Sequence, residues 1–384
     1  MSSKKLTTIW KAEPHTIAKI ALLSTYLKAW FSILGTKPPQ RNAAILYVDG
    51  FAGPGEYTNH STGSPIAAVE AATSALNTHG ANWKAGDIYC AFVELDAARV
   101  KNLQGKLSTI KTHARVHAST YATTFVDGLA AIKAARPRPF SQADPLFVFI
   151  DPFGATGAPF TAVADILRSR SSEVLINLDA DGIARIFHAG EDANRDVLLA
   201  EIFGDTTWQT LLSLDAPFDV LCRQILDLYK RRLRLLPGIG YVFAFEMRDK
   251  AASLSYFLVF ASGHPLGLEK MKEAMRSIDQ SGAHTFCDAD VGQSLLFQFD
   301  DPTEFARRMF DRYKEKRVLY DELRDYALND TPFANPKRML KWIEENDLIE
   351  SVELFPGKTR RRGTFSEDAV KAIVFRQGVT HAQG

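Results

Sequence analysis

The feature that most constrains this chain is an apolar segment that ends in an acid and a glycine-rich turn. Residues 43–48 are apolar, and the sequence continues as Asp49-Gly50-Phe51-Ala52-Gly53-Pro54-Gly55. Such a run is typical of a buried parallel strand that stops at a tight loop. Because Gly53 and Gly55 have no Cβ, the loop can turn sharply and a ligand can approach its backbone. Nucleotide-binding α/β folds place their ligand at this carboxyl edge of the sheet.

Apolar runs and helical patterns alternate through most of the chain. Strands are expected at residues 43–48, 88–93, 115–117, 145–150 and 173–178. Helices are expected at residues 15–34, 66–76, 97–107, 125–134 and 160–169. This alternation indicates an α/β protein with a mostly parallel, Rossmann-like sheet. Two later apolar runs, 241–247 and 254–261, predict an antiparallel hairpin that completes the sheet after a helical insertion at about 183–236.

The last part of the chain has a different pattern. Helical stretches at 304–316, 319–328 and 337–346 precede two expected strands at 348–354 and 359–365. Helices followed by a strand hairpin are typical of a winged helix. The sequence therefore predicts a Rossmann-like domain over residues 1–300 and a small winged-helix-like module over residues 301–384.

Composition excludes several classes of protein. The 384 residues carry 46 basic and 45 acidic side chains, so contact with nucleic acid would need a local basic patch. Cys90, Cys222 and Cys287 lie far apart, which argues against a zinc site and against a disulfide framework. The N-terminus lacks a signal-peptide pattern, and no uncharged apolar run approaches the ~20 residues of a membrane span. We expect a cytoplasmic protein with no metal and no membrane contact.

A second acid stands where the next strand ends. Glu94 follows residues 88–93 directly and is continued by Leu95 and Asp96. In dinucleotide folds an acid at this place accepts hydrogen bonds from ribose hydroxyls. Glu94 is therefore the predicted ribose ligand, and Asp96 competes for the role. The alternative is that the acid is solvated and only favours the start of the next helix.

These features resemble the first motifs of S-adenosylmethionine (SAM) dependent methyltransferases. The pattern D-x-F-A-G-x-G is closer to their motif than to a dehydrogenase fingerprint, because Thr58 replaces the third glycine of G-x-G-x-x-G. The resemblance implies that the turn holds the amino-acid end of SAM, with Asp49 close to its ammonium. The implied cofactor-binding residues are Asp49, Gly50, Phe51, Ala52, Gly53, Gly55, Glu94, Leu95 and Asp96. An ordinary strand–helix loop is the alternative.

The fourth expected strand ends in Asp151-Pro152-Phe153-Gly154, and these four residues are the candidate catalytic set. Amino-group methyltransferases have an Asp or Asn, a proline and an aromatic residue at this edge. The carboxylate accepts from an exocyclic amine, and the ring stacks on the base, which is typically worth about 1–3 kcal/mol. Here the second proline is missing and the aromatic residue comes one place early. The alternative is a proline turn that ends a buried strand.

Basic residues in the tail form the candidate nucleic-acid-binding set. They are expected on the wing and on the helix before it: Lys337, Arg338, Lys341, Lys358, Arg360, Arg361 and Arg362. Together they could contact phosphates. Because acids nearly balance bases in the tail, a module that contacts a protein is an equally open alternative.

One family resembles most of the chain. The matching segments are Y-V-D-G-F-A-G-P-G-E-Y (47–57), G-S-P (63–65), F-V-E (92–94), I-D-P-F-G (150–154), L-I-N (175–177) and Y-F-L-V-F-A-S-G-H-P (256–265). They resemble the three-Cys-motif partner protein family, whose name refers to cysteines of a neighbouring radical-SAM-like protein. The resemblance implies a SAM-methyltransferase-like fold and that protein as a partner.

Two functional hypotheses follow. The first is a SAM-dependent methyltransferase that acts on DNA or RNA, with a base amino group as the favoured acceptor. The second is a nucleic-acid-binding adaptor for the radical-SAM-like partner, with a methyltransferase fold that is catalytically silent. A nicotinamide or other nucleotide enzyme is a third, weaker alternative.

Overall fold

The computed structural model describes residues 8–141, 143–169, 171–189, 193–212, 216–248, 255–279, 285–287 and 301–377. The chain divides into two compact units. The first comprises residues 1–279 and 284–294, and the second comprises residues 280–283 and 295–384. Each unit has its own hydrophobic core.

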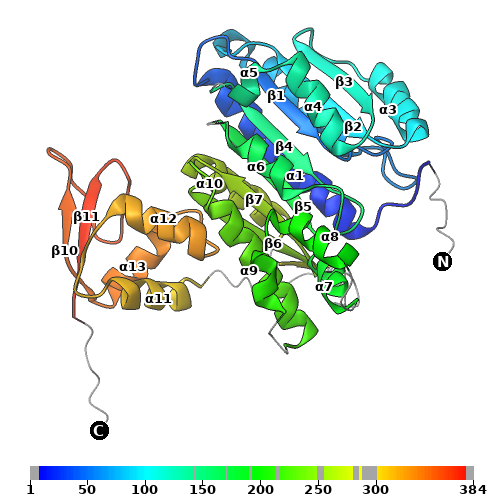
Figure 1. The fold of residues 1–384 in the computed structure, drawn as a ribbon. Coiled ribbons are helices and arrows are strands. Elements are labelled where there is room, and N and C mark those ends of the chain that lie inside the picture. The colour runs from blue at the N-terminus through cyan, green and yellow to red at the C-terminus, as the bar shows by residue number, and fades with distance from the viewer. Residues whose placement is uncertain are drawn as a thin grey trace. The chain divides into compact units, whose positions relative to one another are not determined.

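In the described residues, the first unit contains an eight-stranded sheet in the order β3-β2-β1-β4-β5-β7-β6-β8 (Figure 1). Its strands are β1 (Ile45–Asp49), β2 (Ile88–Glu94), β3 (Val116–Ala122), β4 (Leu146–Ile150), β5 (Ser172–Leu178), β6 (Tyr241–Arg248), β7 (Ser255–Ser262) and β8 (Thr285–Cys287). Strands β1 to β5 run parallel to one another, whereas β7 runs antiparallel to both β5 and β6. The predicted mostly parallel sheet and its antiparallel β6–β7 pair are present, but that pair does not end the sheet, because β8 pairs parallel to β6 at the edge.

Helices cover both faces of this sheet. One face carries α1 (Pro14–Thr36), α2 (Ser64–His79), α3 (Ala97–Thr109) and α10 (Pro265–Ile278). The other carries α4 (Phe125–Ala135), α6 (Phe160–Leu167), α7 (Ala180–His188), α8 (Ala193–Phe203) and α9 (Phe218–Arg234). Shorter turns are η1 (Gly80–Asn82), α5 (Arg138–Ser141) and η2 (Thr207–Leu211).

Strand alternation assigns side chains to these two layers, because successive residues point to opposite faces. On the first face, Tyr47 stacks on Phe147, which in turn contacts Tyr26 and Trp30 of α1. On the second, Val48 belongs to the large core cluster of α4, α6, α7 and α9. Burial of each such side chain contributes about 1.5–3 kcal/mol. The strand ends are thereby fixed at the carboxyl edge.

The segment predicted as a helical insertion is instead a layer of the domain. Helices α7 and α9 pack on each other and on β6 and β7, and their apolar residues join the main core. The predicted helical character of residues 183–236 is present, but α7 and α9 belong to the packed core because both helices have strongly apolar faces that the sheet covers.

Helix α1 has the length and apolar composition of a membrane span, and it is the one described helix that passes that test. Half of its most apolar window is buried within the protein. It packs along α2 and α10, and its Lys19 forms an ion pair with Asp151. These contacts are those of a core helix.

The second unit contains α11 (Thr303–Tyr313), β9 (Arg317–Leu319), α12 (Tyr320–Asp330), α13 (Lys337–Glu345), β10 (Ile349–Leu354) and β11 (Val370–Phe375). Its strands pair in the order β10-β11-β9. The three expected helices are present, but the expected strand at 359–365 is wrong. That stretch is a loop, with Gly363 at φ +78°, and residues 370–375 pair with β10 instead. Apolar side chains fill five of the six positions of this strand, and Val370, Ala372, Ile373 and Phe375 are buried.

Candidate functional site

The glycine turn leaves β1 at the carboxyl edge of the parallel strands. Gly53 and Gly55 have φ values of +62° and +83°, a region that L-residues with a side chain rarely adopt. A Cβ on Gly55 would lie 2.7 Å from Leu103 of α3. At Gly53 the nearest atom to such a Cβ belongs to Trp10, 3.9 Å away. Gly55 therefore packs the loop onto α3, whereas Gly53 leaves room for a group to approach the backbone.

Three other predicted cofactor residues in this turn have packing roles. Gly50 donates its N–H to the Phe149 carbonyl at 2.8 Å, and a Cβ on it would clash with Phe125 at 2.6 Å. The Ala52 N–H donates to the Val93 carbonyl at 2.8 Å. The Phe51 ring stacks on Phe125, with ring centroids 5.5 Å apart. These contacts fix the turn against β2 and α4.

Asp49 is fully buried at the end of β1. Its Oδ1 accepts a hydrogen bond from the Phe51 N–H at 3.2 Å. Its Oδ2 is buried and has no hydrogen-bond partner in the described part of the chain. Burial raises the pKa of this carboxyl to about 7, although hydrogen bonds from the Ser64 side chain and the Phe51 N–H act in the opposite direction, and the neighbouring Asp151 and Glu94 carboxylates add to the rise. An incompletely partnered carboxyl in such a place is a receptor for a cationic donor.

Glu94 points at the glycine turn. Its Oε2 accepts from the Gly53 N–H at 3.0 Å and its Oε1 from the Asp96 N–H at 2.9 Å. The Arg99 guanidinium lies 3.6 Å from Oε1. Two carboxylates, Asp49 and Glu94, therefore flank the turn as the sequence predicted. The site lies where β1 and β2 end.

Leu95 and Asp96, which follow Glu94, are not directed at the glycine turn. Asp96 caps α3, and its Oδ1 accepts from the N–H groups of Ala98 and Arg99 at 2.8 and 3.1 Å. The helix-capping role that the sequence left open for Glu94 belongs to its neighbour Asp96, which was predicted as a competing ribose ligand. Leu95 is 70% exposed, so its side chain adds apolar surface at the rim of the edge.

Asp151, at the end of β4, is held by two residues from distant segments. Both of its oxygens accept from the Lys19 ammonium at 2.8 Å. Its Oδ1 also accepts from the Asn177 amide at 2.6 Å. Lys19 is a functional candidate that sequence reasoning missed, because it lies among the apolar positions of α1. The lysine on the buried face of that helix was the available signal.

The rest of the candidate catalytic set spreads outward from Asp151. Pro152 begins the turn, Phe153 is 59% exposed, and Gly154 has φ +94°. A Cβ on Gly154 would lie 3.9 Å from Asp179, whose side chain caps α7. Asp151 is therefore held within the carboxyl edge of the sheet, whereas the Phe153 ring lies at the protein surface.

A segment before α1 covers this edge. The carbonyl of Trp10 accepts from the Thr58 N–H at 2.9 Å, and the backbone of Ala12 forms two hydrogen bonds with the Asn59 amide. The Trp10 ring lies 5.6 Å from the Phe153 ring. The Arg99 guanidinium lies 4.8 Å from the first ring and 5.3 Å from the second. No periodicity in residues 8–13 indicated this cover, which depends on long-range contacts.

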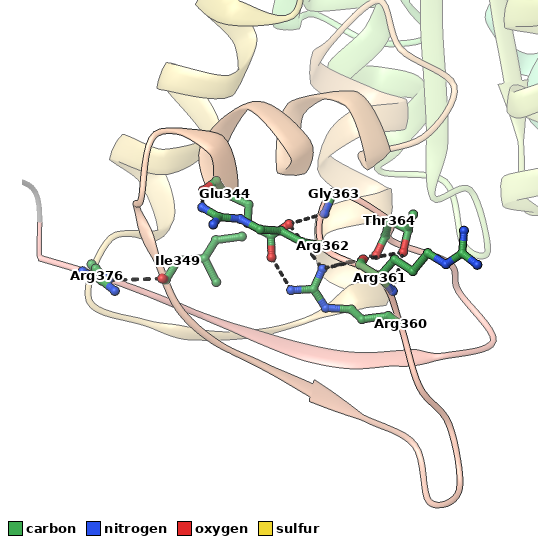
Figure 2. Close-up of polar contacts among 8 residues, drawn as sticks. All are labelled: Glu344, Ile349, Arg360, Arg361, Arg362, Gly363, Thr364 and Arg376. Carbon is green, nitrogen blue, oxygen red and sulfur yellow. Dashed lines mark hydrogen bonds and ion pairs between the residues drawn. The ribbon is translucent and has the colours of Figure 1, made fainter.

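The predicted basic set of the tail has mixed roles. Figure 2 shows the Arg360 guanidinium directed at the Glu344 carboxylate, with which it forms an ion pair. Arg362 donates to the Glu344 carbonyl at 3.3 Å, and the Gly363 N–H donates to the carboxylate. These bonds close the loop around the end of α13. Arg361 is exposed, and its guanidinium lies away from Glu344 in the same view.

The remaining basic residues of this set are exposed at the surface. Lys358 pairs with Asp368 at 3.4 Å, and Lys341 lies 3.7 Å from Glu345. Lys337 is the first residue of α13, and the Arg338 guanidinium lies 5.6 Å from the Phe333 ring. Surface ion pairs of this kind are weak, so these bases can exchange their acidic partners for phosphates. Within the described ranges, no group of three His, Cys, Asp or Glu residues is placed to hold a metal ion.

Comparisons with known proteins concern the fold. No family model matches the chain, and no curated protein matches it in sequence. Cofactor-bound Rv0187 from MTB is 13% identical, with a TM-score of 0.33 over 65% of this chain and 90% of that one. A complex of Trm1 from Pyrococcus horikoshii with S-adenosyl-L-methionine is 10% identical, with a TM-score of 0.34 over 97% of this chain and 94% of that one.

These scores are too low for a likeness to carry function. The sheet itself defines the class of the protein, which is an α/β protein with a mostly parallel sheet. In that sheet β7 is the antiparallel strand, and the pair β6–β8 follows it.

Proposed function

We propose that this chain is a SAM-dependent methyltransferase. The observation that supports the proposal is the buried Asp49 oxygen that lacks a partner among the described residues, beside the open backbone of Gly53. A cationic ammonium is the group that would complete this carboxyl. The sequence motif and the geometry therefore both indicate the Asp49 carboxyl and the Gly53 backbone as the binding groups.

The residues at this edge fit SAM. Asp49 would receive the ammonium, the backbone at Gly53 would face the amino-acid end, and Glu94 would accept from the ribose hydroxyls in place of Arg99. Bound SAM would supply an electrophilic methyl group on its sulfonium. The chain itself would then align the acceptor with that methyl and exclude water, which are effects of position and electrostatics.

A nucleic acid is the acceptor that we propose. The order α11-β9-α12-α13-β10-β11 supports a winged-helix module. Arg361, Lys358 and Lys341 are exposed bases on it. The resemblance to the three-Cys-motif partner family supports a radical-SAM-like protein as the partner, acting in the cytoplasm.

Isothermal titration tests the cofactor proposal. We expect SAM and S-adenosylhomocysteine to bind the full chain with a Kd in the micromolar range, about −8 kcal/mol. Gly53→Val adds a side chain at positive φ on the approach path, and Glu94→Ala removes the ribose acceptor, so both should lose binding. Glu70→Ala, an exposed change on α2, is the control. Folded wild-type protein that binds neither compound would refute the proposal.

The silent adaptor is the second candidate. It is favoured by the pairing of Asp151 with Lys19, which occupies the carboxylate that an amine acceptor would use. An adaptor would still bind nucleic acid through its tail. Arg361→Ala should then weaken binding in a gel-shift assay and reduce its dependence on salt. Arg360→Ala is the matched comparison, because that arginine is committed to Glu344. Equal affinity of Arg361→Ala and wild type would count against a nucleic-acid role for the tail.

A further inference from the structure

Lys19 has no role in the reaction proposed above. Lys19 is 9% exposed and belongs to the first turns of α1, outside the sheet. Among the described residues, it is the cation that forms an ion pair with Asp151. Its ammonium also lies 5.3 Å from the Tyr256 ring. A buried lysine is costly unless it is paired. Lys19 is paired here with one of the candidate catalytic residues, so it can affect the chemistry at this edge.

Lys19 changes what Asp151 can accept. A carboxylate offers about four lone-pair positions. Lys19 engages both oxygens of Asp151, and the Asn177 amide engages Oδ1 again, so one position remains, on Oδ2. The charge of the carboxylate is also balanced. Asp151 is therefore poorly suited to hold an exocyclic amine, which gains positive charge as it attacks a methyl group.

An oxygen nucleophile gains from the same arrangement. A hydroxyl that loses its proton develops negative charge, and a nearby ammonium stabilises that charge strongly where water is excluded. The ammonium of Lys19 has three N–H groups, and two are directed at Asp151. The third can donate to an incoming oxygen.

We propose that Lys19 is a catalytic residue that contacts the acceptor and that the acceptor is a hydroxyl group. This inference rests on the proposed methyltransferase function. The lone pair of the hydroxyl oxygen forms the new bond to the methyl carbon, and the carbon–sulfur bond breaks with its electron pair going to sulfur. The hydroxyl proton passes to water as the new bond forms. In a nucleic acid the internal hydroxyl is the ribose 2′-OH, so the substrate class is RNA.

A binding experiment tests the site without any acceptor. Sinefungin carries an amine where SAM carries its methyl group, and that amine is protonated near neutral pH. In wild type, Lys19 opposes this second ammonium, so sinefungin should bind no more tightly than S-adenosylhomocysteine. In Lys19→Met the freed Asp151 should attract it, and the affinity ratio should shift toward sinefungin by about tenfold.

Lys28→Met, an exposed change on the same helix, is the matched control and should leave the ratio unchanged. A wild-type preference for sinefungin that Lys19→Met does not alter would overturn the inference. Failure of every variant and of wild type to bind S-adenosylhomocysteine would instead refute the proposed function on which it rests.

Product analysis gives an independent readout. Wild-type protein, SAM and total RNA from a strain without this gene should yield 2′-O-methylnucleosides by mass spectrometry, and Lys19→Met should lose about 100-fold of that rate. Base-methylated nucleosides as the product would overturn the hydroxyl assignment. If no methylated nucleoside forms, the hydroxyl assignment fails with RNA, and the sinefungin ratio alone decides whether Lys19 faces the methyl position.

Discussion

Two buried carboxyl groups lie at opposite edges of the same sheet and are completed differently. Glu173, near the start of β5, accepts from the Tyr26 hydroxyl at 2.7 Å and from the Ser262 hydroxyl at 2.8 Å. Asp49, at the end of β1, accepts from the Phe51 N–H and leaves its second oxygen without a partner in the described residues. Burial raises the pKa of both carboxyl groups.

The difference in hydrogen-bond partners between Glu173 and Asp49 distinguishes a structural carboxyl group from a ligand-binding one. A buried polar group without a partner lowers stability, and proteins keep few of them. At the amino edge of the sheet, the chain satisfies its buried acid with its own hydroxyls. At the carboxyl edge, the acid remains incomplete in the place where α/β folds bind ligands. The contrast supports Glu173 as part of the scaffold and Asp49 as part of a binding site.

The largest expected effect is on stability, at the amino edge. Glu173→Ala leaves two buried hydroxyls without their acceptor, so the free energy of unfolding in urea should fall by about 2–4 kcal/mol. Affinity for S-adenosylhomocysteine should stay within twofold of wild type in the folded variant. Glu173→Gln, which keeps one acceptor oxygen, should lose less. A loss below about 1 kcal/mol for the alanine variant would break the comparison.

The next effect is on binding, at the carboxyl edge. Asp49→Asn removes the charge that would hold the cofactor ammonium, so the Kd for S-adenosylhomocysteine should rise about 100-fold, or 2.7 kcal/mol. Titration calorimetry measures this change, and Glu173→Gln is the control from the opposite edge. The unfolding free energy should not fall, because an amide without charge is less costly to bury. An unchanged Kd would remove Asp49 from the site.

The pH dependence of stability is a smaller and independent measure. The pKa of Asp49 is about 7 in the folded protein, above its ordinary value of 3.8. The unfolded chain therefore loses this proton first, and the ligand-free protein becomes less stable as pH rises from about 4 to 7, with no further change above 7.

Comparison with Asp49→Asn isolates this contribution. Relative to the variant, wild type should lose about 2.5 kcal/mol of unfolding free energy between pH 5 and 7.5. Urea denaturation at several pH values measures the difference. Parallel curves for the two proteins would show that Asp49 is not a perturbed carboxyl group.

The smallest effect concerns the cover of the carboxyl edge. Trp10→Ala removes a ring that holds Arg99 over Glu94, a contact worth about 0.5–1 kcal/mol. We expect S-adenosylhomocysteine to associate about three- to fivefold faster in stopped-flow fluorescence. Trp83→Ala, an equal truncation near Gly35, should leave the rate unchanged. Slower association in Trp10→Ala would mean that the ring contacts the ligand instead of covering its place.

Local patterns determined much of the fold. Apolar runs that end in Asp49, Glu94 and Asp151 located three strand ends, because parallel strands buried on both faces are recognisable as short apolar segments. The glycines at 53 and 55 indicated a turn that only positive φ permits. By contrast, residues 359–365 were misassigned, since a loop held by one buried acid, Glu344, has no local signature.

By itself, the sequence determined which carboxylates end the strands and where the backbone turns, because both depend on residues close together in the chain. Only the tertiary structure decided how those carboxylates are partnered. Lys19 and Trp10 reach the edge from an N-terminal segment, and Asn177 reaches it from β5. Such pairings depend on how the helices pack on the sheet, and the local sequence around a residue does not determine that packing.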